Sequence, residues 1–276
     1  MTKLIDFDQR FHQYLHRWME QNAARYPKVE DMEAQMPQVY LDFVNQRADW
    51  LEGRSPGEYF AAINDPEQGV AMLREYQRQG VPIPDLLLER LVDLGTASVP
   101  PLMKLVRDQD APEDLRAAAL NLLIELGSDA PMEDCLALVD AREEEDGLAD
   151  VAAELLQALG PKPVPQMLKR LPGASPSALA TYLDLLCNFP GDERIYEYTM
   201  AEFLKRPAQR AMFASFLGKL GDQRAIEPLR QAMSMDDINY LDYLEIANAI
   251  EMLGGEAGNR DRDFSGDPYY ESLRQL

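Results

Sequence analysis

The residues best suited to chemistry lie on the first predicted helix, which carries both histidines of the chain, His12 and His16. Asp8, His12, His16 and Glu20 follow one another at intervals of four residues, so they share one helix face. Carboxylate and imidazole groups in such an array are ligands for zinc or a similar ion. Four consecutive turns of one helix do not supply a tetrahedral ligand set, however, and ordinary pairing on a solvated face is favoured. We therefore predict no metal site here.

A second candidate metal site lies near the end of the chain. Residues 261–266 (DRDFSG) resemble the start of a calcium-binding EF-hand loop, with Asp261 and Asp263 at positions 1 and 3 and glycine at position 6. Position 12 is Ser272 instead of a bidentate glutamate, and position 8 is Pro268. This departure favours a polar turn.

Neither cysteine has the surroundings of a nucleophile. Cys135 and Cys187 lie among apolar residues of predicted helices, as buried free thiols do, and neither has a histidine nearby in the sequence. The chain has no glycine-rich phosphate loop, no Gly-x-Ser-x-Gly and no His-Glu-x-x-His. We therefore expect no catalytic residues and no cofactor.

Composition narrows the function classes. The chain has 276 residues, of which 46% are apolar, so it can bury a sizeable core. It carries 48 acidic and 27 basic side chains, a net charge of -21, which argues against binding to nucleic acid. No apolar run approaches the roughly 18 residues that span a bilayer, and no secretory signal opens the chain. Two cysteines do not make a disulfide scaffold, which favours a reducing compartment. Together with the lack of a membrane-spanning run, this leads us to expect a cytoplasmic protein without membrane contact.

The acidity is unevenly distributed. Residues 1–80 hold 13 acids and nine bases, so most of the negative charge belongs to the remainder of the chain. Residues 128–160 hold ten acids and one base. Such a surface either keeps the protein in solution or steers it toward a basic partner.

The elements that carry these residues repeat along the chain. Leu-Gly pairs, with one Pro-Gly member, place glycines at intervals of 32, 33, 31, 30 and 33 residues. These glycines are Gly95, Gly127, Gly160, Gly191, Gly221 and Gly254. Glycine commonly ends a helix because it adopts the left-handed conformation without a Cβ penalty. We therefore predict a helix end at each one.

Each interval contains two predicted helices and no strand pattern, so the fold class is all-α. In the first interval, apolar residues at helical spacing over 99–106 are followed by a break and a second helix over 113–126. Later intervals repeat this plan, and Ser175-Pro176 is a helix start signal.

Two stretches resemble a known family. Residues 115–127 (LRAAALNLLIELG) and 210–221 resemble the second helix of a HEAT repeat, and residues 221–229 (GDQRAIEPL) resemble the opening of the short HEAT-like repeats also found in phycobilin lyases. The resemblance implies an α-solenoid of about five stacked helix pairs over residues 81–254. It also implies the extended concave surface on which repeat proteins hold their partners.

The remaining residues form the two ends. Residues 1–80 are predicted to be an N-terminal helical cap, with an aromatic face on the first helix, a second helix over 29–51 and a capping box at Ser55 to Glu58. Residues 255–276 are predicted to be a polar tail that packs back over the last repeat or frays.

The predicted binding surface is the polar column on the second helices, opposite their core face. It consists of Asn121, Asp150, Glu154, Gln157, Thr181, Asn188, Ser215, Asn248 and Glu251.

These observations predict a non-enzymatic module that binds another protein or peptide, with a basic partner favoured by the acidity. Two alternatives stay open: an enzyme or accessory protein of the phycobilin-lyase type, and an acidic mimic of nucleic acid that occupies a DNA-binding protein. The sequence also leaves open a small-molecule site between the cap and the first repeat.

Overall fold

The computed structural model describes residues 4–26, 28–143, 145–258 and 262–273. All regular structure in these ranges is helical and none is strand, which confirms the all-α prediction. None of the described helices is both long enough and apolar enough to pass through a lipid bilayer. Contacts divide the chain into a first unit, residues 1–134 with 150–158, and a second unit, residues 135–149 with 159–276.

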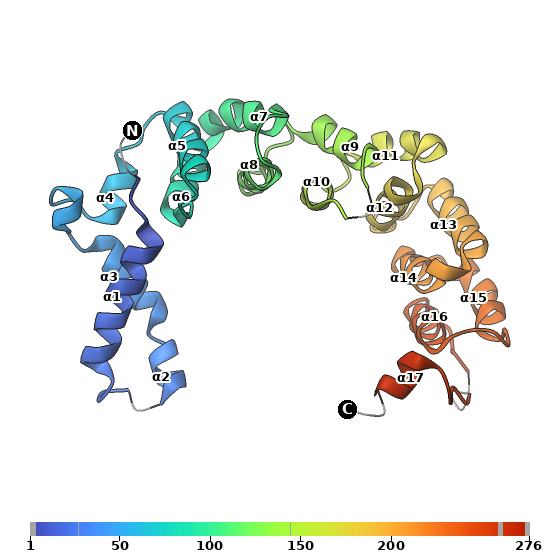
Figure 1. The fold of residues 1–276 in the computed structure, drawn as a ribbon. Helices are drawn as coiled ribbons and strands as arrows, with labels where there is room; N and C mark the ends of the chain where they lie inside the picture. The colour runs from blue at the N-terminus through green and yellow to red at the C-terminus, as the bar shows by residue number, and fades with distance from the viewer. Residues whose placement is uncertain (1–3, 27, 144, 259–261, 274–276) are drawn as a thin grey trace. The chain divides into compact units, whose positions relative to one another are not determined.

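Figure 1 shows the helices coloured in their order along the chain. Those of the first unit are α1 (Phe7–Asn22), α2 (Val29–Glu33), α3 (Met36–Asn45), α4 (Pro56–Ala61), α5 (Pro66–Gln79), α6 (Asp85–Asp93), α7 (Val99–Arg107), α8 (Glu113–Glu125) and most of α10 (Gly147–Ala158). Those of the second unit are most of α9 (Met132–Asp140), then α11 (Val164–Arg170), α12 (Pro176–Leu186), α13 (Glu193–Lys205), α14 (Arg210–Leu220), α15 (Ile226–Met233), α16 (Tyr240–Met252) and α17 (Pro268–Leu273).

The aromatic face of α1 anchors it to the rest of the cap. Phe7 is buried, with its ring centroid 4.8 Å from that of Phe60 and 5.6 Å from that of Trp50. Further along α1, the Phe11 ring lies 5.3 Å from Phe43. The Tyr76 hydroxyl of α5 donates a hydrogen bond to the main-chain oxygen of Ile5, so α1 is tied at its start as well.

The expectation of one helix over residues 29–51 is wrong. The structure has α2, then α3 and a short 3-10 helix over Asp49–Leu51. Pro37 stands in the first turn of α3, where its missing N–H costs nothing, but in the middle of a longer helix the same residue would remove a hydrogen bond and clash with the preceding turn. The capping box at Ser55 is confirmed, because the Ser55 hydroxyl accepts from Glu58 N–H at 3.1 Å and the Glu58 carboxylate accepts from Ser55 N–H at 2.9 Å.

The predicted helix-ending glycines all have a positive φ. The angles lie between 61° and 79° at five of them and at 130° at Gly191. At Gly221, which follows α14, the backbone N–H donates to Leu217 O, as expected of a left-handed helix end. Five of the six glycines lie within two residues of a helix end, as predicted. The helix end predicted at Gly191 is wrong, because α12 already ends at Leu186 and Gly191 lies in the turn before α13.

Consecutive helices pack as neighbouring pairs, which is the arrangement of a helical-repeat solenoid. In the second unit α14 also lies along α16, while α13 packs on α14 and α15 packs on α16 (Figure 1). Gly218 permits the close approach of α14 and α16, because a Cβ there would lie 3.0 Å from the Cα of Ala249. Leu115, Ala119 and Leu123 of α8 are buried in this packing.

The described part of the tail packs back on the last repeat. Phe264 is buried, and its ring centroid lies 5.1 Å from Tyr240 and 5.0 Å from Tyr243, both on α16. The Asp267 carboxylate accepts from the Tyr240 N–H at 3.0 Å, which joins the tail to the start of α16.

Candidate functional site

The polar column predicted on the second helices is largely exposed. Asn121 lies on α8 and Glu154 on α10 in the first unit, and Ser215 and Asn248 lie on α14 and α16 in the second. Asp150 and Gln157 on α10 and Glu251 on α16 are exposed as well. Each unit therefore presents its own portion of the column, with the negative charge of the first portion on α10.

Two members of the column, Thr181 and Asn188, are half-buried, and both make hydrogen bonds within the second unit. The Thr181 hydroxyl accepts a hydrogen bond from Arg142 at 3.0 Å, and it donates one to Ser177 O at 3.1 Å. The Asn188 amide donates to the main-chain oxygen of Asp184 at 3.0 Å. These two side chains are less available to a partner than the exposed members.

Ion pairs join successive repeats within each unit. In the first unit the Arg107 guanidinium contacts the Asp134 carboxylate at 2.8 Å, across 27 residues of sequence. In the second unit Arg224 contacts Glu193 at 2.7 Å, across 31 residues. Further pairs of this kind are Arg74–Asp108, Lys104–Glu67, Arg170–Asp140 and Lys219–Asp184. Their separations are close to the repeat length, so these cations engage acids of a neighbouring repeat or, in Arg74–Asp108 and Lys104–Glu67, join residues 1–80 to the first repeat.

Neither metal-binding pattern gathers a ligand set in the described residues. His16 pairs with Glu20 at 3.5 Å, and His12 donates from Nδ1 to the main-chain oxygen of Asp8 at 2.7 Å, which is ordinary pairing along a helix. Near the chain's end, the Asp263 carboxylate accepts from the backbone and hydroxyl of Ser265. Asp261 lies outside the described residues.

Both thiols are buried and free of disulfides. The Sγ atom of Cys187 lies 3.6 Å from the Thr199 hydroxyl. Burial raises the pKa of Cys187 to about 11, so its thiolate is scarce at neutral pH.

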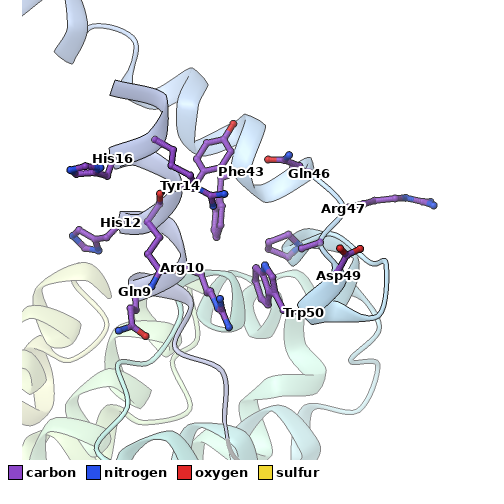
Figure 2. A pocket seen from close by; sticks show the side chains of 14 residues that line it. Gln9, Arg10, His12, Tyr14, His16, Phe43, Gln46, Arg47, Asp49 and Trp50 are labelled. Carbon is purple, nitrogen blue, oxygen red and sulfur yellow. Dashed lines mark hydrogen bonds between the residues drawn. The ribbon is translucent and has the colours of Figure 1, made fainter. Parts of the chain in front are cut away.

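The cap contains a groove of about 970 Å³ between α1 and the segment that follows α3 (Figure 2). Figure 2 shows Arg10 extending toward Trp50, while His12 and His16 point away from Trp50. The guanidinium carbon of Arg10 lies 5.1 Å from the centre of the Trp50 ring, a cation–π contact. Arg17 and Arg47 also line the groove.

The charge of this groove is opposite to that of the whole chain. Three arginines line it, against the single carboxylate of Asp49. The Arg47 guanidinium has an additional acidic neighbour in Glu58, at 3.4 Å. Guanidinium groups bind carboxylates and phosphates, so the groove favours an anionic ligand.

A smaller pocket of about 340 Å³ lies where the cap meets the first repeat. Its walls come from α1, α3 and the start of α6, and they include Phe11, Tyr40 and Phe43. The carboxylates of Asp8 and Asp85 also line it. It lies at the cap–repeat junction, where the sequence had left a small-molecule site open.

The sequence left a site at this junction open but did not predict any of the residues that form the pocket. Tyr40 and Asp85 are 45 positions apart and belong to separate helices. A usable signal was Pro84-Asp85, because an acidic residue after a proline commonly opens a helix and so stays at its exposed end.

The paired helices and the ion pairs at repeat spacing define a helical-repeat protein. Residues 209–234, which contain α14 and α15, match the family model of the PBS lyase HEAT-like repeat. The sequence resemblance to HEAT-like repeats is thus confirmed for this segment, and the neighbouring helix pairs of the described chain are consistent with a helical-repeat solenoid. No curated protein matches the chain significantly. The match concerns the repeat alone and does not favour a bilin-lyase activity.

Proposed function

We propose that the chain is a non-enzymatic binding module that holds a basic protein or peptide against the second helices of its repeats. The exposure of the polar column carries the proposal. On α10, Asp150 and Glu154 are both exposed and lie one turn apart, so their carboxylates share a face. Helical-repeat proteins use such surfaces to hold extended partners.

Charge supports a basic partner. The net charge is -21, and many of the cations engage acids of neighbouring repeats. Acidic surfaces accelerate the encounter with basic partners and reject acidic ones.

The test uses a fluorescent arginine-rich peptide and the same peptide with glutamine in place of every arginine. We expect fluorescence anisotropy to detect binding of the basic peptide to the full chain, and added salt to weaken it. The substitutions Glu154→Lys and Glu251→Lys should each weaken binding by roughly fivefold, the effect of one lost charge contact.

The matched control is Glu197→Lys, which makes the same charge change at an exposed position of the first helix α13. It should leave the affinity nearly unchanged. Equal losses for all three variants would mean that net charge alone attracts the peptide, and unchanged affinity in Glu154→Lys and Glu251→Lys would remove the second helices from the site.

A further inference from the structure

The pocket at the junction of the cap and the first repeat has aromatic walls. The ring of Phe11 stands nearly perpendicular to that of Tyr40, at 88° and 5.3 Å between centroids. It also lies 5.3 Å from the ring of Phe43, which is buried. Phe7 and the buried Pro84 extend this apolar lining.

Carboxylates make the same pocket negative. Asp8 and Asp85 line it and are exposed. Partial burial raises the pKa of Asp8, with further contributions from the negative charges of Asp85 and Asp6. Burial raises the pKa of the Tyr40 hydroxyl too, helped by Glu89, Asp85 and Asp8. The imidazole of His12 also lines the pocket, but none of the lining residues in the described chain is a lysine or an arginine.

Aromatic rings beside carboxylates are the surroundings that organic cations prefer. The negative face of a ring attracts an ammonium or guanidinium group, and alkyl substituents on the cation fill the space between rings. A volume of about 340 Å³ lies near the lower end of the range of small-molecule pockets, about 300–1,000 Å³.

We propose that this pocket binds an alkylated ammonium ion, with its alkyl groups against Phe11, Tyr40 and Phe43 and its charge facing Asp8 and Asp85. A free amine and the modified lysine side chain of a protein both present this group. The proposal is independent of the proposed function, since none of the lining residues belongs to the polar column.

The discriminating probes are choline and its uncharged isostere 3,3-dimethylbutanol, titrated into the full chain and followed by calorimetry and ligand-observed NMR. Both probes have the same shape, so a difference between them measures the effect of the charge. We expect choline to bind at least about tenfold more tightly, since cation–π and carboxylate contacts act together on a partly desolvated charge.

Substitutions of the lining residues test whether choline binds in this pocket. Asp8→Asn and Asp85→Asn preserve shape and should each weaken choline binding by roughly fivefold, and Tyr40→Leu should do the same by removing a ring. Asp31→Asn removes an exposed carboxylate of α2 that does not line the pocket, and should leave affinity unchanged. Thermal unfolding of each variant verifies that the fold persists, which matters for Asp85 because it opens α6.

Equal binding of the two probes would overturn the proposal and leave an apolar cavity, and so would folded Asp8→Asn and Asp85→Asn variants with unchanged affinity. Failure of choline, tetramethylammonium and a trimethyllysine peptide to bind would overturn it as well. If the peptide binds more tightly than choline, the source of the cation is a protein side chain, and if choline binds more tightly, the source is a free amine.

Discussion

Single buried side chains form hydrogen bonds that join neighbouring repeats. Asp242 on α16 is buried, and its carboxylate accepts from the Ala211 N–H at the start of α14, at 3.0 Å. It also accepts from the amide of Asn239, the N-cap of α16, at 2.8 Å. One carboxylate thus satisfies a backbone donor of a neighbouring helix and holds the cap of its own.

Replacing this carboxylate should cost stability. We expect Asp242→Ala to lower the free energy of unfolding by about 1–3 kcal/mol, because it leaves the Ala211 N–H without its acceptor and loosens the cap. Urea unfolding followed by circular dichroism measures the loss. The control is Asp237→Ala, at an exposed position just before α16, which should change stability little. Equal effects of the two substitutions would contradict the assigned role of Asp242.

Arg224 makes stability depend on pH. Its guanidinium lowers the pKa of Asp222 and of Glu193, and it lies 4.2 Å from the ring centre of Tyr196. A carboxyl whose pKa is lowered by folding contributes stability above its unfolded pKa, and this contribution disappears as pH falls through the folded value.

We therefore expect Arg224→Gln to be less stable than the wild type at neutral pH. The difference should be largest above about pH 5 and shrink below about pH 4, where the unfolded carboxyls begin to take up protons. Lys169→Gln removes an exposed cation of α11 and controls for net charge. Thermal melts over this pH range provide the comparison, and a difference that grows toward acid would refute the linkage.

At the level of the helices, local backbone conformation determines where a helix ends, whereas the space between side chains determines how closely two helices cross. Five of the six repeat glycines end helices through a local backbone conformation, whereas Gly191 lies in the turn after α12, and a Cβ added at five of the six would meet nothing within 4 Å. Gly218 acts differently, because its missing side chain lets α14 approach α16. Its role belongs to the crossing of two helices.

A side chain at this crossing should therefore be destabilising. We expect Gly218→Val to lower the free energy of unfolding by about 1–3 kcal/mol, because the added atoms collide with the backbone of Ala249. Ser215→Val introduces the same residue into the same helix at an exposed position, and it controls for helix propensity. Denaturant titrations compare the two variants, and an equally large loss in Ser215→Val would show that the crossing is not the cause.

For the whole molecule, repulsion among like charges opposes the ion pairs between repeats. The net charge of -21 acts over long distances, whereas exposed contact pairs each contribute only about 0–1 kcal/mol. Salt screens interactions longer than the Debye length, about 10 Å at 0.1 M, more than it screens contact pairs.

We therefore expect added sodium chloride to raise the Tm of the full chain from its value at low ionic strength. Differential scanning calorimetry across a salt series measures the change. A Tm that falls steadily with salt would show that the pairs between repeats outweigh the repulsion.

The features that could be predicted are those whose causes lie within a few residues. The helix ends at five of the six glycines, the caps at Ser55 and Ser175 and the all-α class all follow from local backbone preferences. The prediction of one helix over residues 29–51 was wrong. It followed the helical spacing of apolar residues and did not take into account that Pro37 marks the start of a new helix. The predicted polar column is largely exposed, since a face opposite a periodic core faces solvent.

The aromatic pocket and the ion pairs between repeats depend on the tertiary structure. Asp8, Tyr40 and Asp85 become neighbours only when α1, α3 and α6 pack together. Arg224 meets Glu193 across 31 residues because two repeats stack. Sequence periodicity reports which face of a helix is buried but not which helix covers it. That choice is made by side-chain packing summed over the whole interface, so these sites could be recognised only once the helices were in place.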